Sequence, residues 1–308
     1  MNVKTIIKSK FPTLFTWVKK GQNAFFVLLG KYFPKTLIQM LYKSYYGKPI
    51  DLKHPKDIDE KVNYMKLYSD TSLWSLCADK YEVRNYVEGC GLGHTLNELY
   101  GVFDSPEAID FESLPNQFVI KTTNGGGGNS VLIIKDKSTM DVKNVVQTLN
   151  AYLKIPTGYM YAESHYNRIK PRLFVEKFME SDSDSESLVD YKFNCFDGKV
   201  YSVFLCSDRD LGKSVHYSVY DLEWNLYPEK MKAEYATHKV FDKPSSLDLM
   251  IQYSSILSKG IPYVRVDWYE VNGKPIFGEM TFTPAGGFQQ FYSEEYRNEL
   301  GDQCDLFA

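Results

Sequence analysis

Four consecutive glycines lie between two segments rich in β-branched residues, and a lysine comes shortly before them. The sequence predicts a strand over 117–121 that ends on Lys121, and a second strand over 130–135. The loop between these strands contains Gly125, Gly126, Gly127 and Gly128. Glycine adopts left-handed conformations without a steric penalty, and successive free backbone N–H groups can surround a phosphate. We therefore predict that this loop wraps a polyphosphate while the lysine balances its charge.

Three common phosphate-binding motifs do not match, either in this loop or elsewhere in the sequence. Gly212-Lys213-Ser214 lacks the earlier glycine of a Walker A motif, because Ser207 stands there. The dinucleotide pattern GxGxxG fails at Ser130. A protein kinase places its glycine-rich loop before the lysine and also carries HRD and DFG tripeptides, which this sequence lacks. The loop therefore belongs to another kind of phosphate site.

Two acidic residues, Asp267 and Glu279, lie in strands predicted over 264–269 and 275–280. A hairpin with its turn at Asn272-Gly273 would bring them side by side. Mg²⁺ prefers hard oxygen ligands and commonly takes one or two carboxylates plus substrate phosphates. Each acid alone is more simply an exposed strand residue, but as a pair among apolar neighbours they predict a metal site.

Only six of the 36 basic residues are arginine. Arginine offers a planar fork that binds phosphate or carboxylate with two hydrogen bonds. Arg209 lies between two aspartates, and we assign it a role at a phosphate or acyl phosphate. Arg265 lies two residues before Asp267, where a salt bridge is nearly as good an interpretation as a catalytic role.

The order strand, lysine, glycine-rich loop, strand resembles the ATP-grasp superfamily. Lys80, which follows Asp79 at the start of a predicted helix, resembles that superfamily's early phosphate lysine. Segment 173–179 resembles its adenine hinge, where an acid follows a strand and backbone groups hold the base. The resemblance thus implies a nucleotide-binding role for Glu176, Lys177 and Phe178.

Two further segments carry the same resemblance. Asp190-Tyr191-Lys192 resembles a segment that in some members supplies another lysine to the phosphates. It implies a catalytic role for Lys192 and a ribose or structural role for Asp190. Asp267 and Glu279 resemble the paired metal carboxylates. Thr281 stands where many members have asparagine, and its hydroxyl is a third candidate metal ligand.

Within this superfamily the chain resembles the TupA-like group, named for teichuronopeptide synthesis and found with capsule and surface-polysaccharide genes. The matching pieces span about residues 55–290 and lie at 57–68, 79–87, 100–102, 190–193 and 278–284. The resemblance implies ATP and Mg²⁺, with Mn²⁺ as an alternative. It further implies a ligase that joins a carboxylate to an amine through an acyl phosphate and releases ADP. The substrates would be an amino acid or amine and a uronic acid or other carboxylate of a bacterial surface polysaccharide.

Two other classes of enzyme remain open from the sequence. An ATP-grasp kinase would phosphorylate a hydroxyl, and a glycosyltransferase of capsule biosynthesis would use a metal-binding DxD triplet. Three triplets fit that weak pattern: Asp57-x-Asp59, Asp182-x-Asp184 and Asp208-x-Asp210. We rank both classes below the ligase.

The predicted elements indicate an α+β (mixed α/β) chain, which as an ATP-grasp fold would hold the nucleotide between two α+β lobes. Two helical segments broken near Pro12 and Pro34 come first. Further helices are predicted at 60–68, 80–88 (capped by Asp79), 142–154 and 246–259, and further strands at 173–178, 191–196, 199–206 and 216–220. We expect a basic helical extension (1–50), an N-terminal lobe (51–115) and an ATP-grasp domain (116–308), the last divided into a glycine-rich lid (116–180) and a metal-binding subdomain (181–308).

Charge and cysteine content suggest where the protein works. Residues 1–50 contain nine lysines and no acid, whereas the other 258 residues carry 27 basic and 39 acidic groups. This distribution argues against nucleic-acid binding and favours either peripheral membrane contact through residues 1–47 or a helix packed on the body. The apolar run 24–29 is too short to span a bilayer. Five cysteines without a CxxC pair indicate reduced thiols, so we expect a cytoplasmic protein, with the inner membrane face as one location.

Overall fold

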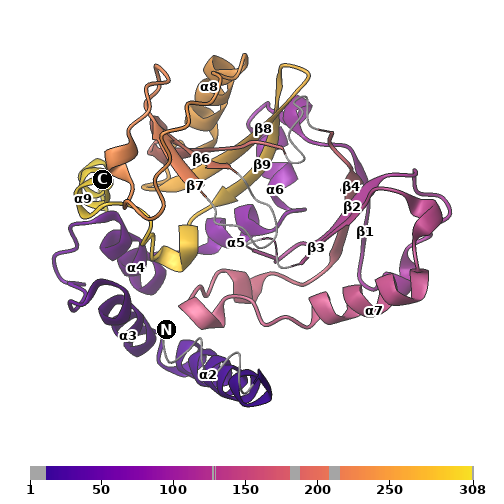
Figure 1. Cartoon of the computed structure of the whole chain (residues 1–308), viewed down its shortest axis with the longest axis horizontal. Helices are drawn as coiled ribbons and strands as arrows, with labels where there is room; N and C mark the ends of the chain where they lie inside the picture. Colours follow the sequence, from indigo (N-terminus) through magenta and orange to yellow (C-terminus); the bar gives the residue numbers. More distant parts are fainter. Residues whose placement is uncertain (1–11, 127, 129, 181–187, 208–215, 307–308) are drawn as a thin grey trace.

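The computed structural model of the protein describes residues 12–126, 128, 130–180, 188–207 and 216–306. Two antiparallel sheets dominate the fold, and helices surround them (Figure 1). The strands are β1 (Leu99–Phe103), β2 (Phe118–Thr122), β3 (Val131–Ile134), β4 (Leu173–Lys177), β5 (Asp190–Phe196), β6 (Lys199–Ser207), β7 (His216–Tyr220), β8 (Val264–Val271) and β9 (Lys274–Thr281). The helices are α2 (Pro12–Tyr32), α3 (Pro34–Tyr46), α4 (Ile58–Tyr68), α5 (Ser72–Ala78), α6 (Val83–Gly89), α7 (Val142–Leu153), α8 (Leu247–Leu257) and α9 (Glu294–Gln303).

The smaller sheet has the order β1-β4-β2-β3, and α7 packs on it. Alternate residues of a strand point to the same face, so Phe118 and Ile120 of β2 both reach one core, where they meet Val145 and Leu149 of α7. β1 comes from the segment expected to form the N-terminal lobe, and it pairs with β4. This sheet carries the glycine-rich loop between β2 and β3.

The larger sheet has the order β7-β6-β5-β8-β9 and forms the main hydrophobic core with α4, α5, α6, α8 and α9. Trp268 at its centre is fully buried, and its indole N–H donates to Ser254 Oγ of α8 at 2.8 Å. The β8–β9 turn has positive φ at Asn272 (52°) and Gly273 (69°), as a tight type I′ hairpin requires. The predicted hairpin is therefore confirmed, and it places Asp267 directly opposite Glu279.

The second N-terminal helix, α3, begins at Pro34, because proline suits the first helical position, where its missing N–H has no partner to lose. One side of α2 packs on the body: Phe26 and Leu29 join a third core with α3. A Cβ at Gly30 would overlap the carbonyl oxygen of Tyr159. The opposite side leaves apolar side chains in solvent, including Phe25, Leu28 and Tyr32. Within the described part of the chain, no helix is both long and apolar enough to cross a bilayer.

The predicted strands agree with the structure to within two residues at each end. The prediction that Asp79 caps a helix over 80–88 was wrong at its start. The Asp79 carboxylate accepts the N–H groups of Tyr81 and Glu82 in a turn, and α6 begins only at Val83. The sequence analysis also missed β1, α5 and α9. β1 contains Gly101 and an irregularity in its pairing, which weakens its strand pattern.

Candidate functional site

A charged cluster lies on the strands β5, β8 and β9 of the larger sheet. Arg265 donates two hydrogen bonds of 2.7 Å to the two oxygens of Asp267. Lys192 Nζ lies 2.5 Å from Asp267 and 2.8 Å from Asp190. Asp267 is almost completely buried, with 1% of its side chain exposed. Two aspartates and two basic side chains thus neutralise one another inside the sheet, which a buried charge requires.

Burial and neighbouring charges act in opposite directions on the pKa values of Asp267 and Arg265. Burial raises the pKa of Asp267, while Arg265 and Lys192 lower it. Burial lowers the pKa of Arg265, but Asp267 more than offsets that effect and the pKa is raised overall. Because two cations contact Asp267 at hydrogen-bond distance, we treat it as a carboxylate.

Glu279 forms the open side of the cluster. Its side chain is 40% exposed, accepts from Thr281 Oγ1 at 3.1 Å, and lies 3.4 Å from Arg265 and 4.0 Å from Lys80. Burial opposes its ionisation, yet Lys80, Lys192 and Arg265 together lower the pKa of Glu279 to about 2. Glu279 therefore presents a permanent negative charge between groups from three parts of the chain.

The glycine-rich loop approaches the same acid from the smaller sheet. The ammonium group of Lys80 donates to the carbonyl of Gly125. The backbone N–H of Lys80 donates to the carbonyl of Thr123, with an N–O distance of 3.0 Å. The loop is narrow at Gly125, because a Cβ there would overlap Ser130 Oγ. Gly128 has a φ of 77°, which favours glycine. Burial lowers the pKa of Lys80 and Glu279 raises it.

A second ion pair lies on the smaller sheet beside the loop. Lys121 Nζ is 2.5 Å from the carboxylate of Glu176, which is 9% exposed and also accepts from Asn97 at 3.2 Å. Lys177 is exposed and lies 3.4 Å from Glu98, while Phe178 is half-buried just after β4. Lys121 and Glu176 also contribute to the electrostatic environment of Lys80. The two ion-pair systems are therefore neighbours across the two sheets.

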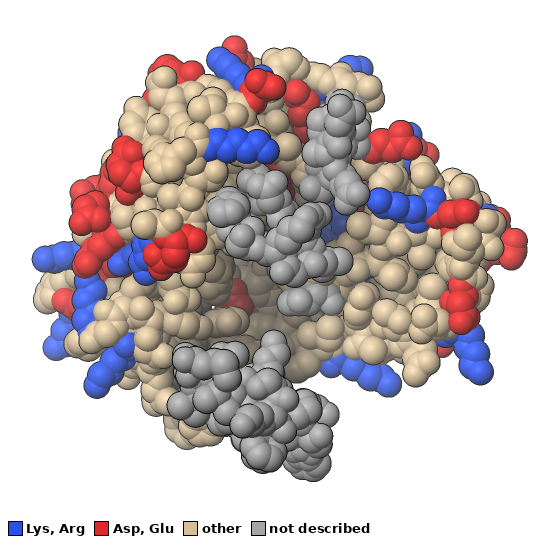
Figure 2. Space-filling view, in the orientation of Figure 1, with Lys and Arg blue, Asp and Glu red and all other residues tan. Residues whose placement is uncertain are grey.

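The structure thus brings together half of the candidates that the sequence nominated. Lys80, Gly125, Glu279, Thr281, Arg265, Asp267, Lys192 and Asp190 form one continuous set of contacts. Gly126 lies next in the loop and is exposed. Gly127 and Arg209 lie outside the described residues. Figure 2 shows a hollow in the surface between the two sheets.

The donor chemistry of this set fits a divalent cation such as Mg²⁺. Glu279 is exposed enough to reach a ligand, and Asp267 and Thr281 place further hard oxygens beside it. No group of three or more His, Cys, Asp or Glu side chains with metal-ligand spacing occurs among the residues that the structure describes. The protein's own ligands would therefore be these few oxygens, and phosphate oxygens would complete the coordination.

Sequence reasoning missed two polar residues beside the cluster, Glu163 and Tyr166. Both belong to the turn between α7 and β4, which contains the short 3₁₀ helices η4 (Tyr159–Tyr161) and η5 (Tyr166–Arg168). Burial raises the pKa of Tyr166, and the charges of Glu163, Glu279 and Asp267 raise it further. No periodic pattern of apolar residues marks this turn in the sequence. Its one local signal is the glycine at position 158, which has a φ of 92° in the structure.

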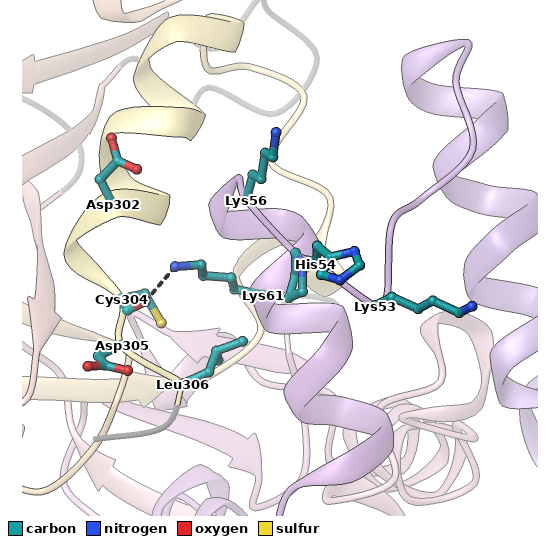
Figure 3. A pocket seen from close by; sticks show the side chains of 9 residues that line it. Lys53, His54, Lys56, Lys61, Asp302, Cys304, Asp305 and Leu306 are labelled. Carbon is teal, nitrogen blue, oxygen red and sulfur yellow. Dashed lines mark hydrogen bonds between the residues drawn. The ribbon is translucent and has the colours of Figure 1, made fainter.

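A separate surface cavity of about 450 Å³ lies between the loop before α4 and the end of α9 (Figure 3). Lys61 at its wall donates to the carbonyls of Gly301 and Cys304 at 2.8 and 2.6 Å. These bonds satisfy carbonyls at the C-terminal end of α9. The cavity contains none of the residues nominated above, so it is not part of the candidate site.

Comparison with known proteins gives one decisive match. The model of the TupA-like ATPgrasp family matches residues 60–305. The chain belongs to the TupA-like ATP-grasp family. Its mixed α+β architecture with two antiparallel sheets is that of the ATP-grasp fold. A search of curated proteins gives no significant match.

Several solved structures are similar to this TupA-like chain. D-alanine-D-alanine ligase from Helicobacter pylori is 13% identical, with a TM-score of 0.44 over 82% of this chain and 68% of that one. The Bacillus anthracis enzyme complexed with ATP is 15% identical, with a TM-score of 0.44 over 87% and 72%. L-amino acid ligase from Bacillus licheniformis is 11% identical, with a TM-score of 0.46 over 80% and 54%. The family assignment rests on the match over residues 60–305.

Proposed function

We propose that this protein is an ATP-dependent ligase that joins a carboxylate to an amine and releases ADP and phosphate. The observation that carries the proposal is the contact between the two sheets at Glu279. There Lys80, which also binds the loop carbonyl of Gly125, lies 4.0 Å from an acid that is paired across the hairpin with Asp267. Lysines and a glycine loop suit a triphosphate, and paired acids suit its metal ion.

The smaller sheet supplies the nucleotide site in this proposal. Lys80, Lys121 and the backbone of the loop 125–128 hold the phosphates. The adenine lies at the end of β4, where backbone groups of Lys177 and Phe178 bind the base. Glu176 fixes Lys121 through their ion pair of 2.5 Å. Asp190 is paired with Lys192, which supports its structural alternative over contact with the ribose.

The larger sheet supplies the charge for phosphoryl transfer. Asp267, Glu279 and Thr281 would hold Mg²⁺, which when bound neutralises the charge of the phosphate oxygens. A substrate carboxylate oxygen attacks the γ-phosphorus, and the bond to the β-phosphate oxygen breaks. ADP leaves, and the substrate has become an acyl phosphate. Arg265, Lys192 and Arg209 stabilise the negative charge that develops, because preformed donors act strongly in a site that excludes water.

The substrates that we propose are an amino acid or amine and a uronic acid or other carboxylate of a bacterial surface polysaccharide. This part of the proposal follows from the TupA-like assignment. The N-terminal helices would bring the enzyme to a membrane-bound glycan at the cytoplasmic face. The exposed apolar residues Phe25, Leu28, Tyr32 and Phe33 lie beside Lys31 and Lys35 in a segment without acids. Such a helix face suits an anionic bilayer surface.

The glycosyltransferase alternative loses one of its three DxD triplets. Asp57 and Asp59 are buried, and their oxygens accept hydrogen bonds from Tyr42, Tyr46 and Gln289. These internal bonds assign the triplet to the packing of α3 and α4 against the segment that precedes α9. The triplets at 182–184 and 208–210 lie outside the described residues.

The proposal is tested by phosphate release from MgATP with a panel of uronic acids, each combined with a panel of amino acids, followed by mass measurement of the product. We expect ADP and a product whose mass equals the two substrates less one water. A product carrying a phosphate, without any amide, would assign the protein to the kinases. ATP turnover that is the same with and without every added substrate would contradict both activities.

A further inference from the structure

The turn from Gly158 to Arg168 places a carboxylate, Glu163, beside the proposed catalytic cluster. Two residues with positive φ, Gly158 (92°) and Ala162 (55°), wind the chain tightly here. Glu163 N donates to Gly158 O at 2.7 Å, and a Cβ at Gly158 would lie only 2.6 Å from the Glu163 carbonyl oxygen. Arg168 anchors the end of the turn to α5 through a 2.9 Å bond to Ser75 Oγ. The turn is thus a rigid support and not a loose connection.

Glu163 is hydrogen-bonded to the segment that follows β9, the strand that carries Glu279. Thr283 Oγ1 donates to its carboxylate at 2.5 Å, and Thr283 follows Glu279 by four residues, which is about 13 Å of extended chain at most. The charges of Glu163, Glu279 and Asp267 all act on the hydroxyl of Tyr166. Glu163 is therefore held close to the end of β9 that carries Glu279.

The carboxylate of Glu163 is incompletely paired. Its side chain is half-buried, and within the described ranges the Thr283 hydroxyl is its one hydrogen-bond donor. The nearby ammonium of Lys66 is directed elsewhere, to Asn63 Oδ1 and Gly286 O, both at 2.8 Å. Burial raises the pKa of Glu163 against the effect of Lys66. A half-buried carboxylate with free lone pairs suits a cationic donor from a ligand.

We infer that Glu163 binds the ammonium group of the amine substrate and accepts its proton. This inference rests on the ligase function proposed above and extends it to the second substrate. The amine enters as an ammonium ion and gives one proton to the Glu163 carboxylate. Its freed lone pair attacks the acyl carbon, the N–C bond forms, and the C–O bond to phosphate breaks with its electrons going to phosphate. The second nitrogen proton passes to the phosphate, which leaves an amide.

The test compares two nucleophiles in Glu163→Gln. Hydroxylamine is largely neutral near pH 7 and traps an acyl phosphate as a hydroxamate without needing an anionic partner, whereas alanine, glutamate and lysine enter protonated. With glucuronate or galacturonate as the carboxylate, we expect the rate of amide formation to fall about 100-fold while hydroxamate formation stays within about twofold of wild type. Thr283→Val should shift the same ratio less, because the carboxylate loses its donor but keeps its charge.

Glu107→Gln is the control, because this carboxylate is exposed and accepts a hydrogen bond of 2.9 Å from Asn150 of α7. Calorimetric ATP binding by Glu163→Gln should match wild type and so report an intact fold. Equal losses with both nucleophiles, or a loss with neither, would overturn the inferred role of Glu163 without contradicting the proposed ligase function. A wild-type enzyme that forms no hydroxamate with any carboxylate would overturn the proposed function and this inference with it.

Discussion

The two sheets contribute to the candidate site in different ways. The smaller sheet offers mainly backbone: a loop with four glycines, in which the carbonyl of Gly125 accepts from Lys80 in the turn before α6. The larger sheet offers side chains that contact one another, with Arg265 and Lys192 both bound to the buried Asp267. The first arrangement leaves room for a ligand to shape the loop, whereas the second is held in place by ion pairs within the protein.

This difference separates two kinds of sensitivity. Substitutions in the charge cluster of the larger sheet should affect folding as well as chemistry, since a buried charge that loses its partner is strongly destabilising. Substitutions in the glycine loop should affect ligand binding while the fold persists, because the loop contributes little to either hydrophobic core. Glu279 is the exception on the larger sheet, since it is 40% exposed.

The largest expected effect is on stability, in Asp267→Asn. Removing this charge leaves Arg265 and Lys192 buried beside a neutral amide, and we expect a loss of about 3–5 kcal/mol in the free energy of unfolding. Urea denaturation measures it. Asp104→Asn, in an exposed pair with Lys170 at 2.8 Å, should leave the midpoint nearly unchanged. Equal midpoints for both variants would contradict the view that the cluster is a structural unit.

The next effect is on turnover, in Glu279→Gln. We expect a loss of about 10²–10³ in phosphate release, as for removal of one preorganised electrostatic group, with an unfolding midpoint close to wild type. Glu294→Gln removes an exposed carboxylate that is paired with Lys48 at 2.6 Å and serves as the control. Retained turnover in Glu279→Gln would remove this acid from the site.

A matched pair of glycines tests the backbone character of the smaller sheet. A Cβ at Gly125 would overlap Ser130 Oγ and approach Thr122 Oγ1 at 2.6 Å, whereas a Cβ at Gly126 meets nothing within 4 Å. We expect Gly125→Ala to raise the Kd for ATP about tenfold, or ~1.4 kcal/mol, and Gly126→Ala to change it little. Calorimetry at constant salt measures both. Equal effects of the two substitutions would show that loop geometry at Gly125 does not matter for binding.

The effect that is smallest at neutral pH concerns acid stability, at a residue outside the charged groups of both sheets. His165 is buried, and burial lowers its pKa to about 3. Among the residues that the structure describes, neither ring nitrogen has a hydrogen-bond partner. The unfolded chain therefore binds one more proton than the folded chain between about pH 6.5 and 3, so this residue makes stability fall as pH falls through that window. In His165→Gln the dependence should be shallower by at most about 1.4 kcal/mol per pH unit.

Urea unfolding at several pH values between 6.5 and 4 checks this prediction. The exposed His54 supplies the control, because His54→Gln should keep the wild-type slope. An unchanged slope in His165→Gln would show that His165 is protonated in the folded protein.

The sequence predicted the parts of the site that depend on residues close to one another in the chain. The glycine loop, the β8–β9 hairpin and the opposition of Asp267 and Glu279 follow from short-range turn and strand chemistry, and the register confirms that opposition. The binding roles assigned to these residues remain predictions. The α+β fold class and the family were also predicted correctly, because the ordered motifs extend over most of the chain.

Other features depend on contacts between distant segments, and the sequence could not show them. Lys80 reaches Gly125 because an Arg172 side chain ties the turn 79–82 to the smaller sheet. Glu163 meets Thr283 across 120 residues. The interpretation of α2 as either membrane-binding or packed on the body was too simple, since one side packs and the other is exposed.

The central claim is that both sheets act on a single magnesium-bound ATP, and calorimetry of ATP binding with and without Mg²⁺ tests it most directly. For wild type we expect Mg²⁺ to tighten ATP binding. For Glu279→Gln we expect ATP to bind without Mg²⁺ as in wild type, through the smaller sheet, and Mg²⁺ to add little. The same Mg²⁺ dependence in both proteins would contradict the claim, because the acid of the larger sheet would then play no part in holding the metal–nucleotide complex.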